Sequence, residues 1–299
     1  MFFLWGRELK TLSVKSPAKL NLYLEILGKR KDGYHNLRTL FHRISLCDTL
    51  VLKKRKSGFS LKTDLSKLPT DESNLITKAY RLLQRYCPHL GGVDVILKKK
   101  IPMGAGLGGG SSNAASFLMA MNTLYNLKLS RRQLLNMAKK LGADVPFFIY
   151  DKNQAIGLDR GDRIRIRESK VKHVFLLIIS QQSLSTPQVF SRYKNLTSQS
   201  VLTKKDPTDR LLCTFLDRKR YSRIVVSLFN DLEKSAFLIR PAVRRTVEKI
   251  KKEGFEAVRM SGSGPTVFVL LPDYLDSKKM QSKVKRLFPS TRVELVETY

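Results

Sequence analysis

A run of closely spaced glycines between a strand-like and a helix-like segment constrains this chain more than any other feature. Residues 98–115 read KKKIPMGAGLGGGSSNAA, with five glycines and two serines. Glycine lets successive backbone N–H groups turn inward without a Cβ clash, and the N-terminus of a following helix carries a partial positive charge. The segment therefore predicts a loop that binds a di- or triphosphate.

The spacing of these glycines excludes two common phosphate loops. A P-loop requires a lysine directly after its last glycine, and none follows here. Gly104, Gly106 and Gly109 match the dinucleotide fingerprint, but that motif also requires an acidic residue about 20 positions later. Residues 95–143 contain no Asp or Glu, so this match is incomplete. The remaining alternative, a flexible Gly/Ser turn, is disfavoured because Ser112 is followed by the apolar spacing of an N-capped amphipathic helix.

The charge around the loop suits an anionic ligand. Residues 95–143 carry the basic side chains of Lys98, Lys99, Lys100, Lys128, Arg131, Arg132, Lys139 and Lys140. The whole chain has 56 basic and 25 acidic residues, a net charge of +31, which by itself raises the possibility of nucleic-acid binding. The charge is spread over both halves of the sequence, and no basic helix with interleaved aromatics is present. We therefore expect no nucleic-acid partner, and a positive surface that steers an anionic substrate.

Hydrophobic spacing predicts a mixture of strands and helices. Runs of strand length and pattern occupy residues 18–27, 44–52, 93–97 and 174–179, whereas helical spacing occupies residues 75–86, 130–141 and 241–254 and begins again at Ser277. The polar stretch 197–210 is expected to be an exposed loop, and a break between two lobes is expected near residues 155–170. The pattern indicates a protein of mixed strands and helices with two lobes.

Three motifs in one order resemble those of the GHMP small-molecule kinases, a family that includes galactose, homoserine and mevalonate kinases. The first is residues 17–22 (PAKLNL), the second is the glycine loop at 102–115, and the third is residues 260–266 (MSGSGPT). Two further segments, residues 32–35 (DGYH) and 141–148 (LGADVPFF), resemble the members that phosphorylate a cytidine-diphospho sugar alcohol in non-mevalonate isoprenoid synthesis. The resemblance covers nearly the whole chain and weakens between residues 197 and 223.

This resemblance implies an α+β, two-domain GHMP kinase fold with ATP and substrate in the inter-domain cleft. The implied domains are an N-terminal ATP-binding domain at residues 1–160 and a C-terminal kinase domain at residues 161–299. We also expect a cytoplasmic enzyme, a monomer or weak homodimer, with no membrane partner. The apolar run at residues 1–5 is too short for a signal or spanning segment, and the three cysteines have no disulfide or zinc spacing.

The resemblance also assigns site residues. Lys19 and Asp144 are implied to be catalytic, with Asp144 orienting the acceptor hydroxyl and Lys19 as its electrostatic partner. The implied ATP-binding residues are Asn74, Lys99, Pro102, Gly104, Gly106, Leu107, Gly108, Gly109, Gly110, Ser111 and Ser112. The implied substrate-binding residues are Asn21, Tyr34, His35, Phe41, Phe190, Gly262, Ser263 and Gly264. Mg²⁺ is expected with ATP, but no protein ligand is assigned, because Ser111, Ser112 or Asp144 could each supply an oxygen.

Most of these residues also have a purely structural interpretation. Asp144 and Asn74 could be helix caps, and Lys19 and Lys99 could be solvated lysines on strands. Residues 262–264 could be a plain hairpin turn, and Phe190 could be a core side chain. Ala105 stands where some members of the family have glycine, which the loop tolerates only if Ala105 keeps a negative φ.

Two other functions remain open. A GHMP kinase for homoserine or mevalonate-type alcohols would share the phosphate loop but not the DGYH segment together with Phe190. A non-catalytic GHMP protein would be expected to lose Asp144 or Lys19, and both are present.

Overall fold

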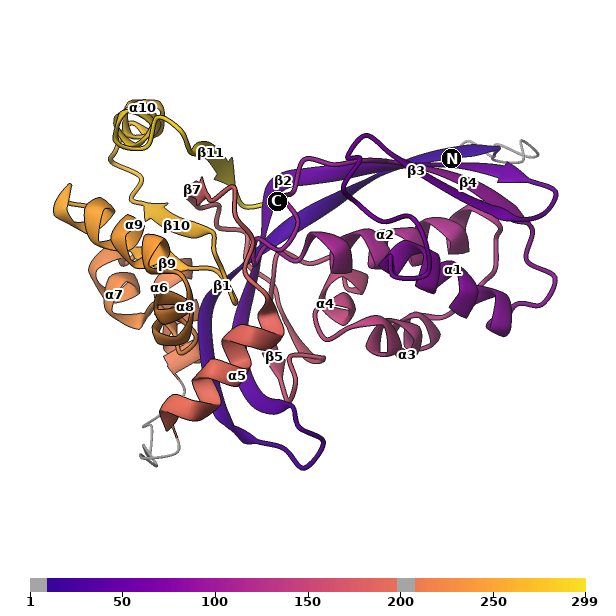
Figure 1. Cartoon of the computed structure of the whole chain (residues 1–299), viewed down its shortest axis with the longest axis horizontal. Helices are drawn as coiled ribbons and strands as arrows, with labels where there is room; N and C mark the ends of the chain where they lie inside the picture. Colours follow the sequence, from indigo (N-terminus) through magenta and orange to yellow (C-terminus); the bar gives the residue numbers. More distant parts are fainter. Residues whose placement is uncertain (1–9, 198–207) are drawn as a thin grey trace. The chain divides into compact units, whose positions relative to one another are not determined.

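The computed structural model describes residues 10–197 and 208–299, which form two compact units (Figure 1). The first unit contains residues 10–16 with Cys47–Lys100 and Gly109–Tyr150, and the second contains Pro17–Leu46, Ile101–Gly108 and most of the chain after Asp151. The chain passes between the units more than once, so they are not two consecutive halves of the sequence. The boundary at residue 160 between the implied family domains stays a prediction.

The first unit places four helices on one face of a short stretch of sheet (Figure 1). Strand β3 (Phe59–Thr63) runs parallel to β4 (Gly92–Lys98), and β4 pairs antiparallel with the second half of β2 (His35–Arg55), from Thr49↔Lys98 to Arg55↔Gly92. The helices that cover these strands are α1 (Leu75–Tyr86), α2 (Gly109–Leu124), α3 (Arg131–Leu141) and α4 (Val145–Ile149).

Local capping explains where the helices of this unit begin. The Asn74 side chain accepts a hydrogen bond from the Ile76 N–H at 2.9 Å, which satisfies one donor at the start of α1. Ser130 and Gln133 form a reciprocal capping box at α3. The helices expected at residues 75–86 and 130–141 are confirmed.

The second unit contains two groups of strands. The first half of β2 pairs antiparallel with β5 (Gln154–Leu158), which pairs with β6 (Arg163–Arg167), and β1 (Thr11–Lys29) pairs in parallel with β8 (Phe229–Asn230). A separate antiparallel sheet has the order β11-β7-β10-β9, in which β7 (Val174–Ile179) pairs with β11 on one side and β10 on the other. The other strands of this sheet are β9 (Val258–Met260), β10 (Val267–Leu271) and β11 (Arg292–Glu297).

Strand β7 shows how this sheet is buried on both faces. Phe175, Leu177 and Ile179 join one hydrophobic cluster, and Leu176 and Ile178 join the other. Successive side chains of a strand point to opposite faces, so a continuously apolar strand requires cover on both. The helices of this unit are α5 (Thr186–Thr197), α6 (Thr208–Asp217), α7 (Tyr221–Ser227), α8 (Glu233–Ile239), α9 (Pro241–Lys252) and α10 (Ser277–Leu287). The expected mixed α+β class is confirmed.

One expectation about local structure is wrong, and a second is wrong at the ends of its segment. Helix α2 begins at Gly109, so Ser112 lies inside its first turn instead of capping it, and the helix is buried around most of its circumference instead of being amphipathic. The glycine run can continue into the helix because tertiary contacts hold the first turn. The stretch 197–210 was expected to be a loop, but α6 already begins at Thr208, and residues 198–207 lie outside the described part of the chain.

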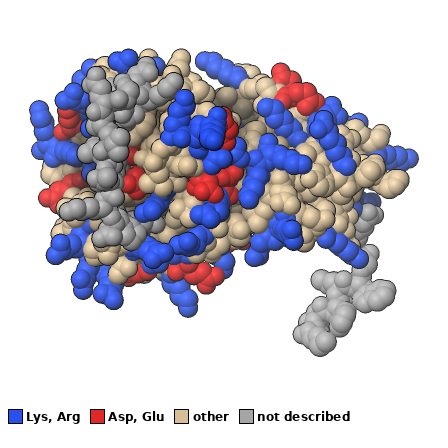
Figure 2. Space-filling model, turned by 90° about the horizontal axis from the view of Figure 1, so that it is seen from below, with Lys and Arg blue, Asp and Glu red and all other residues tan. Residues whose placement is uncertain are grey.

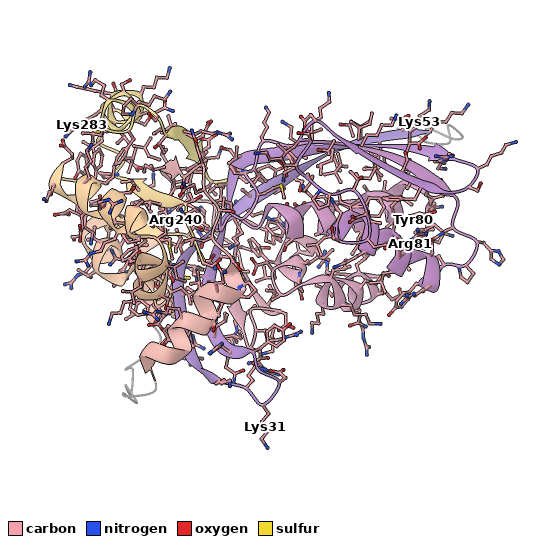
Figure 3. All side chains as sticks on the ribbon, in the orientation of Figure 1. Lys31, Lys53, Tyr80, Arg81, Arg240 and Lys283 are labelled. Atoms are coloured by element: carbon pink, nitrogen blue, oxygen red, sulfur yellow. The ribbon has the colours of Figure 1, made fainter. Side chains whose placement is uncertain are left out.

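On the face shown in Figure 2, basic side chains are distributed over the surface with Asp and Glu interspersed. Lys31, in the turn between β1 and β2, and Lys53, in β2, are exposed and extend away from the ribbon (Figure 3). Long cationic side chains such as these place their charge in solvent. Among residues 10–197 and 208–299, no helix is long and apolar enough to cross a membrane.

Two buried histidines predict a loss of stability in acid. The His42 and His173 side chains are buried, with ring centroids 6.0 Å apart. Burial lowers the pKa of His42 to about 3, with a further contribution from His173, and burial with the charge of Lys219 lowers the pKa of His173 to about 4. In the unfolded chain both histidines have a pKa of about 6.5, so below that pH the unfolded state binds protons that the folded state does not. The free energy of unfolding should therefore fall as the pH is lowered from about 6.5 to the folded-state pKa values, about 4 for His173 and about 3 for His42.

Each histidine should contribute a slope of up to about 1.4 kcal/mol per pH unit in that window. Chemical denaturation at pH 7, 6 and 5 measures the slope, and His42→Gln, which does not titrate, should reduce it. An unchanged slope in the Gln variant would contradict this account.

Candidate active site

The glycine loop is built around left-handed backbone. Gly104, Gly106 and Gly108 have φ values of 59°, 76° and 68°. A Cβ on Gly106 would lie 2.2 Å from the Ser261 carbonyl oxygen, closer than any real contact allows. Ala105 does not have a positive φ, so the loop tolerates its Cβ, as the sequence analysis required. The loop therefore needs glycine both for its conformation and for close approach to another segment.

Lys19 is a buried lysine, not a solvated one. Its residue exposure is 3%, and its Nζ donates to Asn21 Oδ1 at 2.6 Å and to the Gly106 carbonyl oxygen at 3.0 Å. The Nζ also lies 5.8 Å from the ring centroid of Phe41, which is itself fully buried. Two predicted site residues and the phosphate loop thus meet at one ammonium group within the second unit.

Asn21 is held in turn by a residue that the sequence did not indicate. Its Nδ2 donates to Thr39 Oγ1 at 2.7 Å, and the Thr39 hydroxyl donates to the Tyr23 carbonyl oxygen at 2.7 Å. With its amide group oriented by Thr39, Asn21 presents its oxygen to Lys19.

Residues 261–264 form the expected turn, which is fastened to the phosphate loop. The Gly264 N–H donates to the Ser261 carbonyl oxygen at 2.9 Å, and the Ser261 hydroxyl donates to the Gly106 carbonyl oxygen at 3.0 Å. Asn230 holds the turn from the other side, because its Nδ2 donates to the carbonyl oxygens of Met260 and Gly262, both at 2.8 Å. No local motif marks Asn230, so sequence reasoning missed it.

An aromatic group forms around His35. Its ring centroid lies 5.4 Å from that of Phe190, with the planes 31° apart, and 6.2 Å from that of Tyr193, which is edge-on. Phe190 and Tyr193 are partly buried against the core. Phe190 therefore also packs against the core, as its structural interpretation requires. Burial and the nearby carboxylates of Asp231 and Glu25 raise the pKa of Tyr193 to about 12, which keeps its hydroxyl protonated. Tyr193 is a further residue that the sequence did not indicate.

Helix α5 carries Phe190 and Tyr193 and contacts the turn at 261–264. At its first residue, Thr186 Oγ1 lies 2.7 Å from Ser263 Oγ. Tyr34 has a different environment, because it is 57% exposed and the Arg160 guanidinium lies 5.2 Å from its ring centroid. The structure thus groups His35 with Phe190, whereas the implied role of Tyr34 in substrate binding stays a prediction.

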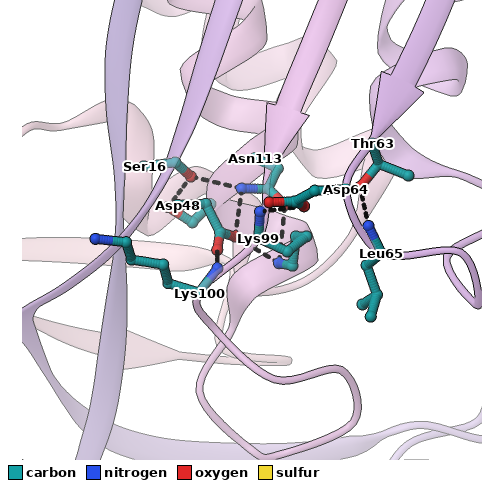
Figure 4. Close-up of polar contacts among 9 residues, drawn as sticks. Ser16, Asp48, Thr63, Asp64, Leu65, Lys99, Lys100 and Asn113 are labelled. Carbon is teal, nitrogen blue, oxygen red and sulfur yellow. Dashed lines mark hydrogen bonds and ion pairs between the residues drawn. The ribbon is translucent and has the colours of Figure 1, made fainter.

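The start of α2 presents some of its predicted ATP-binding residues and buries others. Gly110 is exposed and Ser111 is half-buried, whereas Ser112 is fully buried and its hydroxyl accepts a hydrogen bond from Ser16 Oγ at 2.7 Å. Lys99 is also buried, since its side chain is 6% exposed and its ammonium contacts the Asp48 carboxylate (Figure 4). Its ATP contact stays a prediction, and the alternative of an exposed strand-end lysine is wrong.

Of the two site residues that could be helix caps, Asn74 is one and Asp144 is not. Asn74 caps α1, and its Nδ2 also donates to the Pro69 carbonyl oxygen at 2.7 Å, so that structural role is confirmed. Asp144 occupies the residue before α4, but its side chain makes no capping hydrogen bond. The capping role therefore does not account for Asp144.

The described part of the chain contains no group of three or more His, Cys, Asp or Glu side chains that could hold a metal ion. Mg²⁺ does not require such a group, because it commonly keeps several waters and takes phosphate oxygens together with one or two carboxylates.

Comparisons with known proteins agree with this architecture. A family model described as GHMP kinases N terminal domain matches residues 74–152, and one described as GHMP kinases C terminal matches residues 216–290. The chain is 36% identical, over 94% of its length and 90% of the relative, to a 4-diphosphocytidyl-2-C-methyl-D-erythritol kinase of Polynucleobacter necessarius subsp. necessarius (strain STIR1).

Two solved structures extend the comparison. A crystal structure of 4-(cytidine 5'-diphospho)-2C-methyl-D-erythritol kinase is similar with a TM-score of 0.77 and 30% identity, covering 96% of this chain and all of that one (100%). A homoserine kinase from Cytophaga hutchinsonii has a TM-score of 0.75 at 18% identity, covering 100% of this chain and 97% of that one. The second likeness concerns the fold alone.

Proposed function

This chain belongs to the GHMP kinases, and from that premise we propose that it phosphorylates a cytidine-diphospho alcohol with ATP. The acceptor is the 2-hydroxyl of 4-diphosphocytidyl-2-C-methyl-D-erythritol, an intermediate of the non-mevalonate route to isoprenoid precursors. The observation that carries the proposal is the grouping of His35, Phe190 and Tyr193 beside a turn fastened to the phosphate loop. An aromatic group with a hydrogen-bonding imidazole suits a nucleobase better than a bare alcohol.

Lys19 and Asp144 are proposed to carry the chemical step. Phosphoryl transfer has a loose transition state, so catalysis depends on positioning and on neutralising charge on the transferring oxygens. Lys19 supplies a cation held in place by Asn21 and the Gly106 carbonyl oxygen. Asp144 would orient the acceptor hydroxyl and finally accept its proton.

The phosphates of ATP are proposed to bind at the glycine loop and the first turn of α2. Gly110 and Ser111 are accessible there, and the helix N-terminus favours negative charge. Mg²⁺ is proposed to enter with ATP. The Asp144 carboxylate and the Ser111 hydroxyl are hard oxygen donors that fit it, and the ion would supply charge neutralisation at the β- and γ-phosphates. Cytoplasmic location and a monomeric or weakly dimeric state stay predictions.

An assay of ATP consumption tests the function directly. The cytidine-diphospho substrate should be turned over, whereas homoserine, mevalonate and galactose should not. Turnover of homoserine or mevalonate in its place would favour the second candidate, a GHMP kinase that shares only the fold and the loop. No turnover of any alcohol would favour a binding protein.

Removing the aromatic ring of Phe190 should weaken the cytidine substrate selectively. Base-on-aromatic stacking is worth about 1–3 kcal/mol, so Phe190→Ala should lower kcat/KM for this substrate about 10- to 100-fold and leave the KM for ATP unchanged. Phe190→Tyr keeps a ring and should retain most activity. If both variants lost activity equally and both had a lower Tm, Phe190 would be a packing residue.

A further inference from the structure

A buried carboxylate joins the two stems of the phosphate loop (Figure 4). Asp48 in β2 is 0% exposed, and its oxygens accept hydrogen bonds from the Lys100 N–H at 2.7 Å and from Asn113 Nδ2 at 2.9 Å, in addition to the ion pair with Lys99. Lys99 and Lys100 directly precede the loop, and Asn113 follows it in the first turns of α2. One side chain from a distant strand therefore contacts the chain on both sides of the loop.

The contacts continue to the start of α2. Asn113 Oδ1 accepts from Lys99 Nζ at 3.3 Å, and Asn113 Nδ2 also donates to Ser16 Oγ at 2.9 Å. Ser16 Oγ in turn donates to Ser112 Oγ at 2.7 Å. The chain of bonds thus reaches from Asp48 to the first turn of α2, whose N-terminus is expected to face phosphate.

Such an arrangement is a poor source of net stability. Removing two charges from water costs several kcal/mol per ion in a typical protein, and the pairing in the interior often only balances this cost. In some proteins such buried polar groups instead specify a unique geometry. Here the geometry that they define is the separation of the two stems of the loop.

We propose that Asp48 is a positioning residue for ATP, whose carboxylate holds residues 99–100 and 113 at the spacing that the phosphate loop needs to bind phosphate. Asn113, Ser16 and Ser112 transmit this position to the first turn of α2. This inference rests on the proposed function, since it takes ATP as the ligand of the loop.

In Asp48→Asn we expect the loop to occupy its binding-competent conformation about a tenth of the time. Because apparent affinity falls in proportion to the competent fraction, the KM for ATP should rise by about tenfold. The kcat at saturating ATP and the KM for the cytidine substrate should stay within about twofold of wild type. Asn113→Ala, which leaves the ion pair of Asp48 and Lys99 in place but disconnects the second stem, should shift the KM for ATP in the same direction.

Asp94→Asn is the matched control. Asp94 lies in the same unit and accepts hydrogen bonds from Arg55 Nη1 at 2.8 Å and from Ser60 Oγ at 2.6 Å, but its side chain is 42% exposed. This variant also loses a paired carboxylate, and its KM for ATP should not change.

Two measurements separate this inference from the proposed function. Calorimetry with ADP and with CDP, and amide hydrogen exchange over residues 101–112, do not require turnover. Weaker ADP binding and faster exchange in Asp48→Asn would support the positioning role even if wild type failed to phosphorylate the cytidine substrate. Variants with a lower Tm, but with ADP affinity and loop exchange like those of wild type, would overturn it and leave Asp48 as a structural residue.

Discussion

Asp144→Asn is expected to lower kcat by about 100-fold or more at saturating ATP and cytidine substrate. Asparagine keeps the shape of the side chain, but an amide cannot accept the proton of the acceptor hydroxyl. Steady-state kinetics of the purified variant measures the loss. A kcat near that of wild type would remove Asp144 from the chemical step.

A measurement of Tm separates this loss from unfolding. Asp144 precedes α4, and its side chain makes no capping hydrogen bond to that helix, so the substitution should not weaken the start of α4. Asparagine also keeps the size of the side chain, so we expect a Tm near that of wild type and unchanged binding of ATP in calorimetry. A large fall in Tm would show that the residue has a structural role that its helix position does not reveal.

Gly106→Ala is expected to destabilise the protein and to weaken the binding of ATP. Alanine at a φ of 76° costs about 1–2 kcal/mol, and its Cβ would lie 2.2 Å from the Ser261 carbonyl oxygen, which adds about 1–3 kcal/mol of overpacking. The carbonyl oxygen of Gly106 also accepts hydrogen bonds from Lys19 and Ser261, so any backbone shift disturbs both. Denaturant unfolding should show a loss of about 2–5 kcal/mol, and calorimetry a loss of at least about tenfold in ATP affinity.

Gly142→Ala serves as the stability control. Gly142 has an extended φ of 169°, and a Cβ there would meet Val145 Cγ2 at 3.4 Å, an ordinary contact. Its unfolding free energy should change by less than about 1 kcal/mol. If Gly106→Ala were as stable as Gly142→Ala and bound ATP normally, the packing of the loop against residues 261–264 would not matter for the site.

Local signals predicted much of the fold. Apolar spacing predicted α1, α3 and α9 close to their observed bounds, and short-range features stand at their starts: Asn74 before α1, the Ser130–Gln133 capping box at α3 and Pro241 at α9. Helix α2 departed from its prediction because its first turn is held by Ser16 and Asp48, which are far away in the sequence. A pattern within one segment carries no information about such partners.

The candidate site divides in the same way. The glycine loop, Lys19 and the turn at 262–264 lie in contiguous motifs, and their chemistry could be interpreted before any fold was known. Thr39, Asn230 and Tyr193 could not be found, since each acts through a neighbour more than a dozen residues away.

By itself the sequence determined the family, the phosphate loop and the residue types available for chemistry, because these depend on short motifs whose backbone and charge requirements are local. Only the tertiary structure decided that Lys19 is buried against the loop, that Gly106 can be nothing but glycine, and that Lys99 is paired with Asp48. Those features depend on which distant segments pack together, and packing is a property of the whole folded chain.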